Sequence, residues 1–233
     1  MRHASDNPLL DRMARGLLFP YLGLMHRLRW YGTENVPRTG PAVLAANHQS
    51  YYDPVLISFA AHRRVTFLGW DFFCKMPVLG TFMRLVGTIP VDLDAPEPGA
   101  IARMIRTLDQ GGLCGIFPEG GRSADGLIAE PKPGVATLAL RSGAPVVPVT
   151  VHGAHRAWPR GRALPVPAPI SIYFGPPLHV EPWSGRRDEA YQEHRRQITY
   201  DIMLRIADGF ARLGRPDLAH ACRRKLTALS GRR

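Results

Sequence analysis

Cysteine is scarce in this chain of 233 residues, which contains only Cys74, Cys114 and Cys222. Their number is odd and they are far apart, so the pattern predicts neither a disulfide framework nor a cysteine-based zinc site. A reducing compartment suits this composition best.

Long apolar runs are also missing. The N-terminal stretch has only residues 16–26 free of formal charge, which is well short of the ~20 residues that a membrane-spanning helix needs. Arg27 and Arg29 close this run, and no small-residue cleavage pattern follows. We therefore expect neither a spanning helix nor a signal peptide here.

Acidic residues are few, with 19 Asp and Glu against 30 Lys and Arg, which gives a net charge of +11. The excess lies at the ends: residues 1–31 carry five Arg against two acids, and residues 186–233 carry twelve basic residues against six acids. Basic residues interleaved with stacking aromatic residues, as in a nucleic-acid groove, are not found. The pattern favours an anionic membrane surface as partner over nucleic acid.

The sequence has no internal repeat. From about residue 41 onward, short apolar runs alternate with helical patterns, which is typical of a sheet covered by helices. Strands are predicted at residues 41–46, 65–69, 87–91, 113–117, 146–151 and 170–175. Helices are predicted at residues 54–63, 76–85, 98–110 and 133–142, with two more toward the C-terminus, the last over 216–229. We expect one α/β domain with a central, mostly parallel sheet flanked by helices.

The two ends of the chain are predicted to be helical. Near the N-terminus, apolar residues recur at helical spacing, with Pro20 as a break: Leu9, Leu10, Met13, Leu17, Leu24 and Leu28. This stripe could dock on a membrane or pack on the protein's own core, and the pattern does not decide between them. The expected division is a membrane-associating segment at 1–31, a catalytic domain at 32–185 and C-terminal helices at 186–233, packed on or flanking that domain.

The run "AANHQSYYDP" places His48 five residues before Asp53. One interpretation is a catalytic base with its orienting carboxylate. The alternative is that Asp53 caps a helix that begins at Pro54, since a carboxylate accepts orphan amides and proline has none. In a regular helix residues five apart point about 140° apart, so contact between the two requires the chain to turn.

The run "GIFPEGGRSADG" places Glu119, Gly120, Gly121 and Arg122 in a glycine-rich turn after a predicted strand. Ligands of α/β sheets bind beyond the carboxyl ends of strands. Glycines allow backbone amides to approach an anion, and arginine can grip a phosphate with two hydrogen bonds. A plain surface turn with a Glu–Arg pair is the alternative.

Together, "NHQSYYD", "FPEGGRS" at 117–123 and "VVPV" at 146–149 resemble the glycerolipid acyltransferases, whose best-known members are the 1-acylglycerol-3-phosphate acyltransferases. The resemblance covers roughly residues 30–180. It implies that His48 is a general base, that Asp53 orients it, that Glu119, Gly120, Gly121, Arg122 and Lys75 bind the acceptor, and that Pro148 lies on the acyl-donor side. It implies no metal and no cofactor.

The implied reaction moves a fatty acyl group from acyl-CoA or acyl-carrier protein to the hydroxyl of a lysophospholipid. The first expected acceptor is 1-acyl-sn-glycerol-3-phosphate, which would give phosphatidic acid. The enzyme is expected at the cytoplasmic face of the cell membrane, peripheral or monotopic. The alternatives are another lysolipid acceptor, or a catalytically idle protein that binds lipid at the membrane.

Two departures from the family pattern leave the acceptor open. The second motif usually ends in Arg, whereas this chain has Leu93 in "VDLD", and Trp70 stands where many members have Lys. A serine hydrolase is not indicated, because neither Ser50 nor Ser123 lies in a Gly-x-Ser-x-Gly elbow. His152 and His155 have no obvious third metal ligand, so a structural or site-lining role is favoured.

Overall fold

The computed structural model describes residues 16, 20–70, 88–91, 98–159, 161–162 and 164–231. Within them, one seven-stranded sheet has the order β1-β7-β6-β2-β5-β3-β4. The strands are β1 (Arg29–Tyr31), β2 (Ala42–Ala46), β3 (Val65–Trp70), β4 (Ile89–Val91), β5 (Leu113–Ile116), β6 (Val146–His152) and β7 (Ser171–Phe174).

The sheet is mostly parallel, since β6, β2, β5, β3 and β4 all run in one direction. The β6–β7 pair is antiparallel, and β1 pairs with β7 in parallel, so the β1–β7 edge is reversed. The expected fold class is therefore confirmed.

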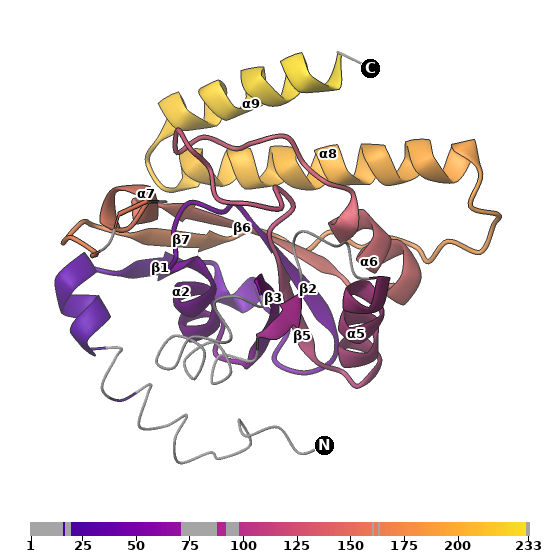
Figure 1. Ribbon diagram of the computed structural model, residues 1–233, viewed down its shortest axis with the longest axis horizontal. Helices are drawn as coiled ribbons and strands as arrows, with labels where there is room; N and C mark the ends of the chain where they lie inside the picture. Colours follow the sequence, from indigo (N-terminus) through magenta and orange to yellow (C-terminus); the bar gives the residue numbers. More distant parts are fainter. Residues whose placement is uncertain are drawn as a thin grey trace.

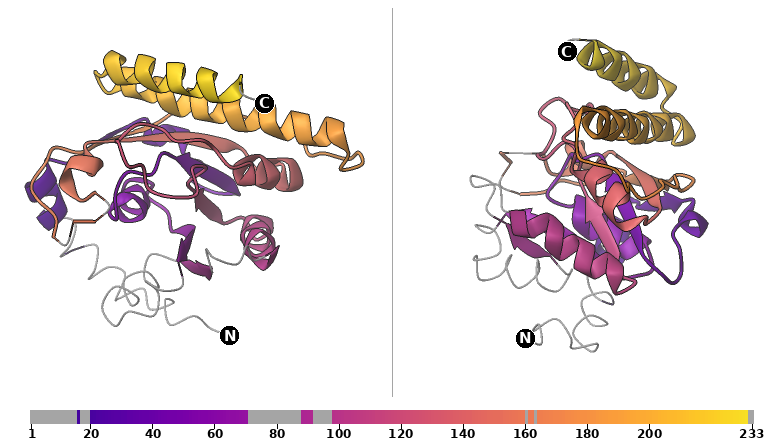
Figure 2. Two further views of the ribbon diagram at one scale, coloured as in Figure 1. Left: turned by 45° about the horizontal axis from the view of Figure 1, so that its top comes forward. Right: turned by 90° about the vertical axis from the view of Figure 1, so that its right-hand side faces the viewer.

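Helices cover both faces of the sheet, as Figures 1 and 2 show. They are the 3-10 helix η1 (Thr33–Asn35), α2 (Asp53–Ala60), α5 (Pro98–Asp109), α6 (Gly134–Ser142), α7 (Ala154–Ala157), α8 (Glu189–Arg212) and α9 (Pro216–Ser230). In Figure 1, α8 lies along the sheet and α9 lies over α8.

The central strand β2 separates two hydrophobic cores. Val43 and Ala45 face a core shared with α5, α6, α8 and α9, whereas Leu44 faces a core shared with α2 and α7. All five residues of β2 are buried. Burial on both faces explains why the strand is a continuous apolar run, and it places the loop after β2 in the middle of the sheet's carboxyl edge.

The six predicted strands and the helices at α2, α5, α6, α8 and α9 are all present, within a few residues of the expected bounds. The predicted helix at 76–85 lies outside the described residues. Residues 20–26 are helical, but β1 follows directly inside the segment expected to be helical, and α7 was not predicted. The division at residues 31/32 and 185/186 stays a prediction.

Candidate active site

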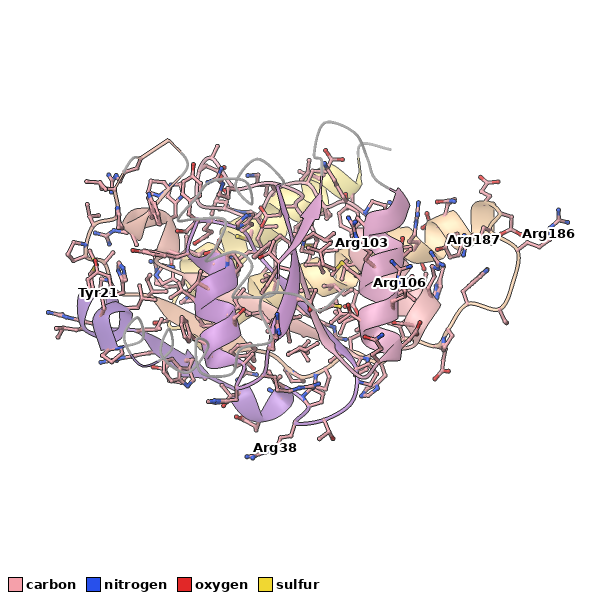
Figure 3. All side chains as sticks on the ribbon, turned by 60° about the horizontal axis from the view of Figure 1, so that its bottom comes forward. Tyr21, Arg38, Arg103, Arg106, Arg186 and Arg187 are labelled. Atoms are coloured by element: carbon pink, nitrogen blue, oxygen red, sulfur yellow. The ribbon has the colours of Figure 1, made fainter. Side chains whose placement is uncertain are left out.

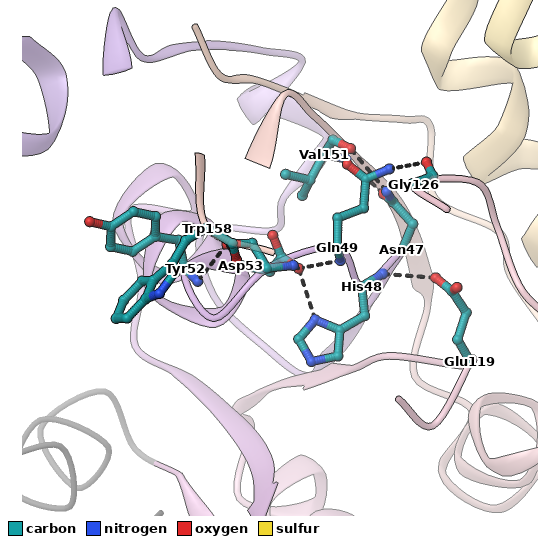
Figure 4. Close-up of polar contacts among 10 residues, drawn as sticks. Asn47, His48, Gln49, Tyr52, Asp53, Glu119, Gly126, Val151 and Trp158 are labelled. Atoms are coloured by element: carbon teal, nitrogen blue, oxygen red, sulfur yellow. Dashed lines mark hydrogen bonds and ion pairs between the residues drawn. The ribbon is translucent and has the colours of Figure 1, made fainter. Parts of the chain in front are cut away.

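Two loops meet at the carboxyl edge of the sheet. His48 follows β2, Glu119 follows β5, and these strands are parallel neighbours with Ala45 opposite Ile116. The carboxyl ends of parallel strands lie at one edge, so residues 71 positions apart become adjacent. Figure 4 shows the resulting cluster around His48 and Asp53.

His48 and Asp53 are in contact. The Nδ1 atom of His48 lies 2.8 Å from Asp53 Oδ2. The Asp53 side chain is fully buried, while that of His48 keeps 17% of its surface exposed. Because a carboxylate only accepts, Nδ1 carries the proton and donates, and the lone pair on Nε2 is left to take a proton from a substrate. This is the geometry of an oriented general base.

The chain turns between the two residues, as their contact requires. Residues 47–50 are irregular, residues 51–52 form a turn, and α2 begins at Asp53 itself. The capping interpretation of Asp53 is wrong in detail: the N-cap position is Tyr52, and the carboxylate turns back instead of along the helix. Its Oδ2 accepts the backbone amides of Gln49 at 2.6 Å and Ser50 at 2.7 Å.

One oxygen of Asp53 thus accepts three N–H groups. The two backbone amides fix the carboxylate within its loop, and the third bond fixes the imidazole. Oδ1 is buried without a hydrogen-bond partner. A single oxygen of Asp53 therefore links the backbone of the loop to the orientation of the His48 ring.

Glu119 holds His48 from the other side. Its Oε1 accepts the backbone N–H of His48 at 2.8 Å, and its Oε2 accepts that of Ala129 at 2.8 Å. Burial raises the pKa of Glu119 to about 7, although these two amide bonds act to lower it. Both oxygens of this carboxylate accept backbone amides, so Glu119 holds the loop after β2 against the loop after β5. The expected contact of Glu119 with the acceptor stays a prediction.

Further contacts around His48 were not foreseen. Phe117 stacks on the imidazole with ring centroids 3.9 Å apart. The Asn47 side chain pairs with the backbone of Val151 through Nδ2 to the carbonyl at 2.9 Å and from the amide to Oδ1 at 2.7 Å. Asn47 therefore extends the β2–β6 ladder by one side chain. The sequence shows an asparagine beside His48, but it could not show which residue that asparagine contacts, because the partner lies 104 residues away.

Arg122 lies in the loop after β5, as Glu119 does, and it is half-buried. Its guanidinium lies 3.6 Å above the centre of the Tyr51 ring. Gly120 has a φ of +67°, and a Cβ there would crowd the Lys132 side chain. Gly121 has open space around it. The cation is therefore placed beside the His48 loop, on a turn whose backbone requires glycine at position 120.

The remaining predicted site residues lie in different places. Pro148 is buried within β6, opposite Ala45 of β2. Lys75 lies outside the described residues. Among the residues that are described, no three His, Cys, Asp or Glu side chains come together as a metal site. His152 Nε2 instead lies 3.2 Å from Arg215 Nη1.

Comparison with known proteins identifies relatives of this chain. A family model described as "Acyltransferase" matches residues 27–152. A 1-acyl-sn-glycerol-3-phosphate acyltransferase of Limnanthes alba is 29% identical over 70% of this chain and 58% of its own length. The enzyme of that name from Bacillus subtilis is 28% identical over 68% of this chain and 77% of its own.

A solved structure is similar as well. It is the 1-acyl-sn-glycerophosphate acyltransferase PlsC from Thermotoga maritima, with a TM-score of 0.61 and 25% identity over 81% of this chain and 73% of that one. The family match spans both loops of the cluster and more than half of the chain. The chain therefore belongs to the acyltransferase family.

Proposed function

We propose that this protein is an acyltransferase that moves a fatty acyl group from a thioester to the hydroxyl of a lysophospholipid. The observation that carries the proposal is the hydrogen bond of 2.8 Å between His48 Nδ1 and the buried Asp53 carboxylate. The names of the relatives make 1-acyl-sn-glycerol-3-phosphate the first acceptor to test.

In the proposed mechanism, Nε2 of neutral His48 takes the proton of the acceptor hydroxyl as its oxygen attacks the thioester carbonyl. Asp53 stabilises the imidazolium that forms. The C–S bond then breaks, and the departing thiolate receives the proton from His48. The products are the ester and the free thiol, and no covalent intermediate on the protein is required because the thioester is already activated.

We assign the other site residues by position. Arg122 is the candidate to bind the acceptor's phosphate, because it lies beside the His48 loop and its guanidinium can donate two parallel hydrogen bonds. Gly120 and Gly121 let the backbone come close to the same group. Pro148 and Lys75 stay assigned to the donor and acceptor sides by resemblance alone.

For Glu119 the hydrogen bonds support a positioning role. An ionised carboxylate would repel a phosphate, and both of its oxygens already accept amides from His48 and Ala129. We propose that Glu119 fixes the backbone of His48 and thereby the direction from which the acceptor hydroxyl attacks the thioester carbonyl.

The reaction is proposed at the cytoplasmic face of a membrane, where an acyl-CoA or acyl-carrier protein donor meets a lysolipid. Within the residues that the structure describes, no helix is both long and apolar enough to cross a bilayer. The excess positive charge suits an anionic lipid surface.

The test is release of free thiol from acyl-CoA and from acyl-carrier protein, with a panel of lysolipids as acceptors. We expect turnover with a lysophospholipid, and a loss of about a thousandfold or more in His48→Ala. Asp53→Asn should fold, since its amide oxygen can still accept, yet lose activity because the imidazolium is no longer stabilised. Wild type without turnover on any acceptor would support the idle lipid-binding alternative instead.

A further inference from the structure

The exposed large apolar side chains of the described residues are confined to two short segments. They are Tyr21, Leu24 and Tyr31 in one segment, and Leu164 and Val166 in the other. Leu24 is 87% exposed and Leu164 is 75% exposed. Scattered apolar side chains are normal on a protein surface, but their restriction to residues 21–31 and 164–166 is a pattern to explain.

These segments lie side by side although more than 130 residues separate them in sequence. The amide of Ile170 donates to the carbonyl of His26 at 2.9 Å, and the amide of Arg29 donates to the carbonyl of Ile170 at 3.0 Å. His26, fully buried, places Nδ1 3.2 Å from the carbonyl of Ala168. In Figure 1 and in the left view of Figure 2, the loop after α7 and the helix at 20–26 occupy the same end of the molecule.

Neither segment contains an acid, and arginines lie within the first and shortly before the second. No Asp or Glu occurs in residues 12–33 or in residues 131–180. The exposed arginines are Arg27 and Arg29 in the first segment, and Arg156 and Arg162 before the second. Apolar side chains surrounded by arginine match the surface of an anionic bilayer, which offers acyl chains beneath negative headgroups.

The second segment is also tied to the candidate active site. The Ser50 hydroxyl donates to the carbonyl of Trp158 at 2.9 Å. The Trp158 ring packs against the rings of Tyr51 and Tyr52, with centroids 5.1 and 4.9 Å away. The loop that carries Leu164 and Val166 therefore begins beside the His48–Asp53 turn.

We propose that residues 161–162 and 164–168 form a membrane-contacting element, which makes one surface with the helix at 20–26 and holds the His48 loop next to an anionic bilayer. This rests on the proposed function, because a lysolipid acceptor has to be taken from that bilayer. The surface, called the two-segment surface below, consists of the five apolar residues and four arginines named above.

The test is cosedimentation of the full chain with vesicles of phosphatidylcholine alone and of phosphatidylcholine with phosphatidylglycerol. The apolar variant is Leu164→Ser with Val166→Ser, and the charge variant is Arg29→Glu with Arg162→Glu. The matched control is Arg186→Glu with Arg187→Glu, which changes the net charge equally. Arg186 and Arg187 lie at the opposite end of the molecule from Tyr21 (Figure 3).

We expect wild type to prefer the anionic vesicles, each surface variant to bind them about tenfold more weakly or worse, and the control to stay within about twofold. Leu164→Met should bind like wild type, because it keeps an apolar side chain. Thiol release measured in detergent micelles should be unchanged in the surface variants, which shows that they are folded. His48→Ala should bind vesicles normally while turnover is lost. Vesicle binding therefore tests the membrane surface, and turnover tests the proposed function, independently of each other.

Three results would overturn the proposal. The first is a Leu164→Ser/Val166→Ser variant that binds anionic vesicles as well as wild type does. The second is equal binding of wild type to both vesicle types. The third is loss of self-association in the surface variants with no change in vesicle binding, which would make a second copy of the chain the occupant.

Discussion

At the scale of single residues, the site depends on two buried carboxylates that act through backbone amides. Asp53 accepts the amides of Gln49 and Ser50, and Glu119 accepts those of His48 and Ala129. Each carboxylate stabilises a stretch of irregular backbone that has no ladder partner of its own. His48 is therefore held by its side chain and by its main chain at once.

Glu119 should act on turnover more than on acceptor binding. In Glu119→Gln the side-chain oxygen can still accept the N–H of His48. The new NH2 group faces the N–H of Ala129, and because two donors cannot bond to each other, the loop should shift. We expect kcat to fall about tenfold to a hundredfold, while KM for the acceptor changes less than about threefold. Glu181→Gln, at an exposed position, is the control. A large rise in KM with kcat preserved would instead assign Glu119 to acceptor binding.

The pKa of Glu119 also predicts a pH dependence of stability. Because burial raises this pKa from 4.5 to about 7, the folded protein holds a proton that the unfolded chain releases. The free energy of unfolding should therefore fall as pH rises from about 4.5 to 7, by at most about 3 kcal/mol from this group. Urea denaturation of wild type and Glu119→Gln at both ends of this range measures the difference, which should be absent in the variant.

At the scale of elements, most of the fold was predictable because apolar runs and helical periodicity reflect burial directly. β1 was not predicted, because its three residues directly follow apolar residues at helical spacing and are too few to show the alternation typical of a strand. The reversal of β7 was also missed, since a strand's direction depends on its connection and its partner. In the site, the residue types indicated chemistry, but the bonds of Asn47 and Glu119 depend on which loops meet.

The contact of α8 with the sheet gives a test at this scale. Thr150 of β6 donates its hydroxyl to the carbonyl of Ile206 at 2.6 Å, and Gly209 of α8 lies over that side chain. A Cβ at Gly209 would overlap Thr150 Oγ1. Gly209→Ala should therefore lower the free energy of unfolding by about 1–3 kcal/mol.

Gly99 of α5 is the matched control, because a Cβ there meets nothing within 4 Å. Gly99→Ala should be neutral or stabilising by up to about 1 kcal/mol, as alanine favours helix more than glycine does. Chemical denaturation of both variants makes the comparison. Equal effects at the two positions would mean that α8 does not pack closely on β6.

At the scale of the whole molecule, the C-terminal helix reaches the candidate site. Lys225 of α9 lies 2.8 Å from Asp125, which accepts the amide of Leu127 in the loop after β5. Buried side chains of α9 complete the core on that face: Ala219, Cys222 and Leu226. The loop that carries Glu119 and Arg122 is therefore covered by residues beyond the region matched by the family model.

A shortened chain that ends at Gly214 lacks α9 and tests whether this helix supports the loop after β5. We expect a lower melting temperature, since burial of a side chain such as Leu226 contributes about 1.5–3 kcal/mol, together with reduced turnover. Lys225→Gln alone should change stability by less than about 1 kcal/mol, because both members of its ion pair are partly exposed. Full activity of the shortened chain would show that α9 does not support the loop.

The central place of β2 has a consequence for synthesis. Its two neighbours, β5 and β6, come later in the chain, and 104 residues separate Asn47 from its partner Val151. At ~5–20 residues per second, the strand that precedes His48 waits roughly 5 to 20 s for that partner to be made. Both edges of β2 stay unpaired until β5 is made, and the edge that pairs with β6 stays open for the rest of this time, so chaperone binding should concentrate on residues 42–46 until β6 leaves the ribosome.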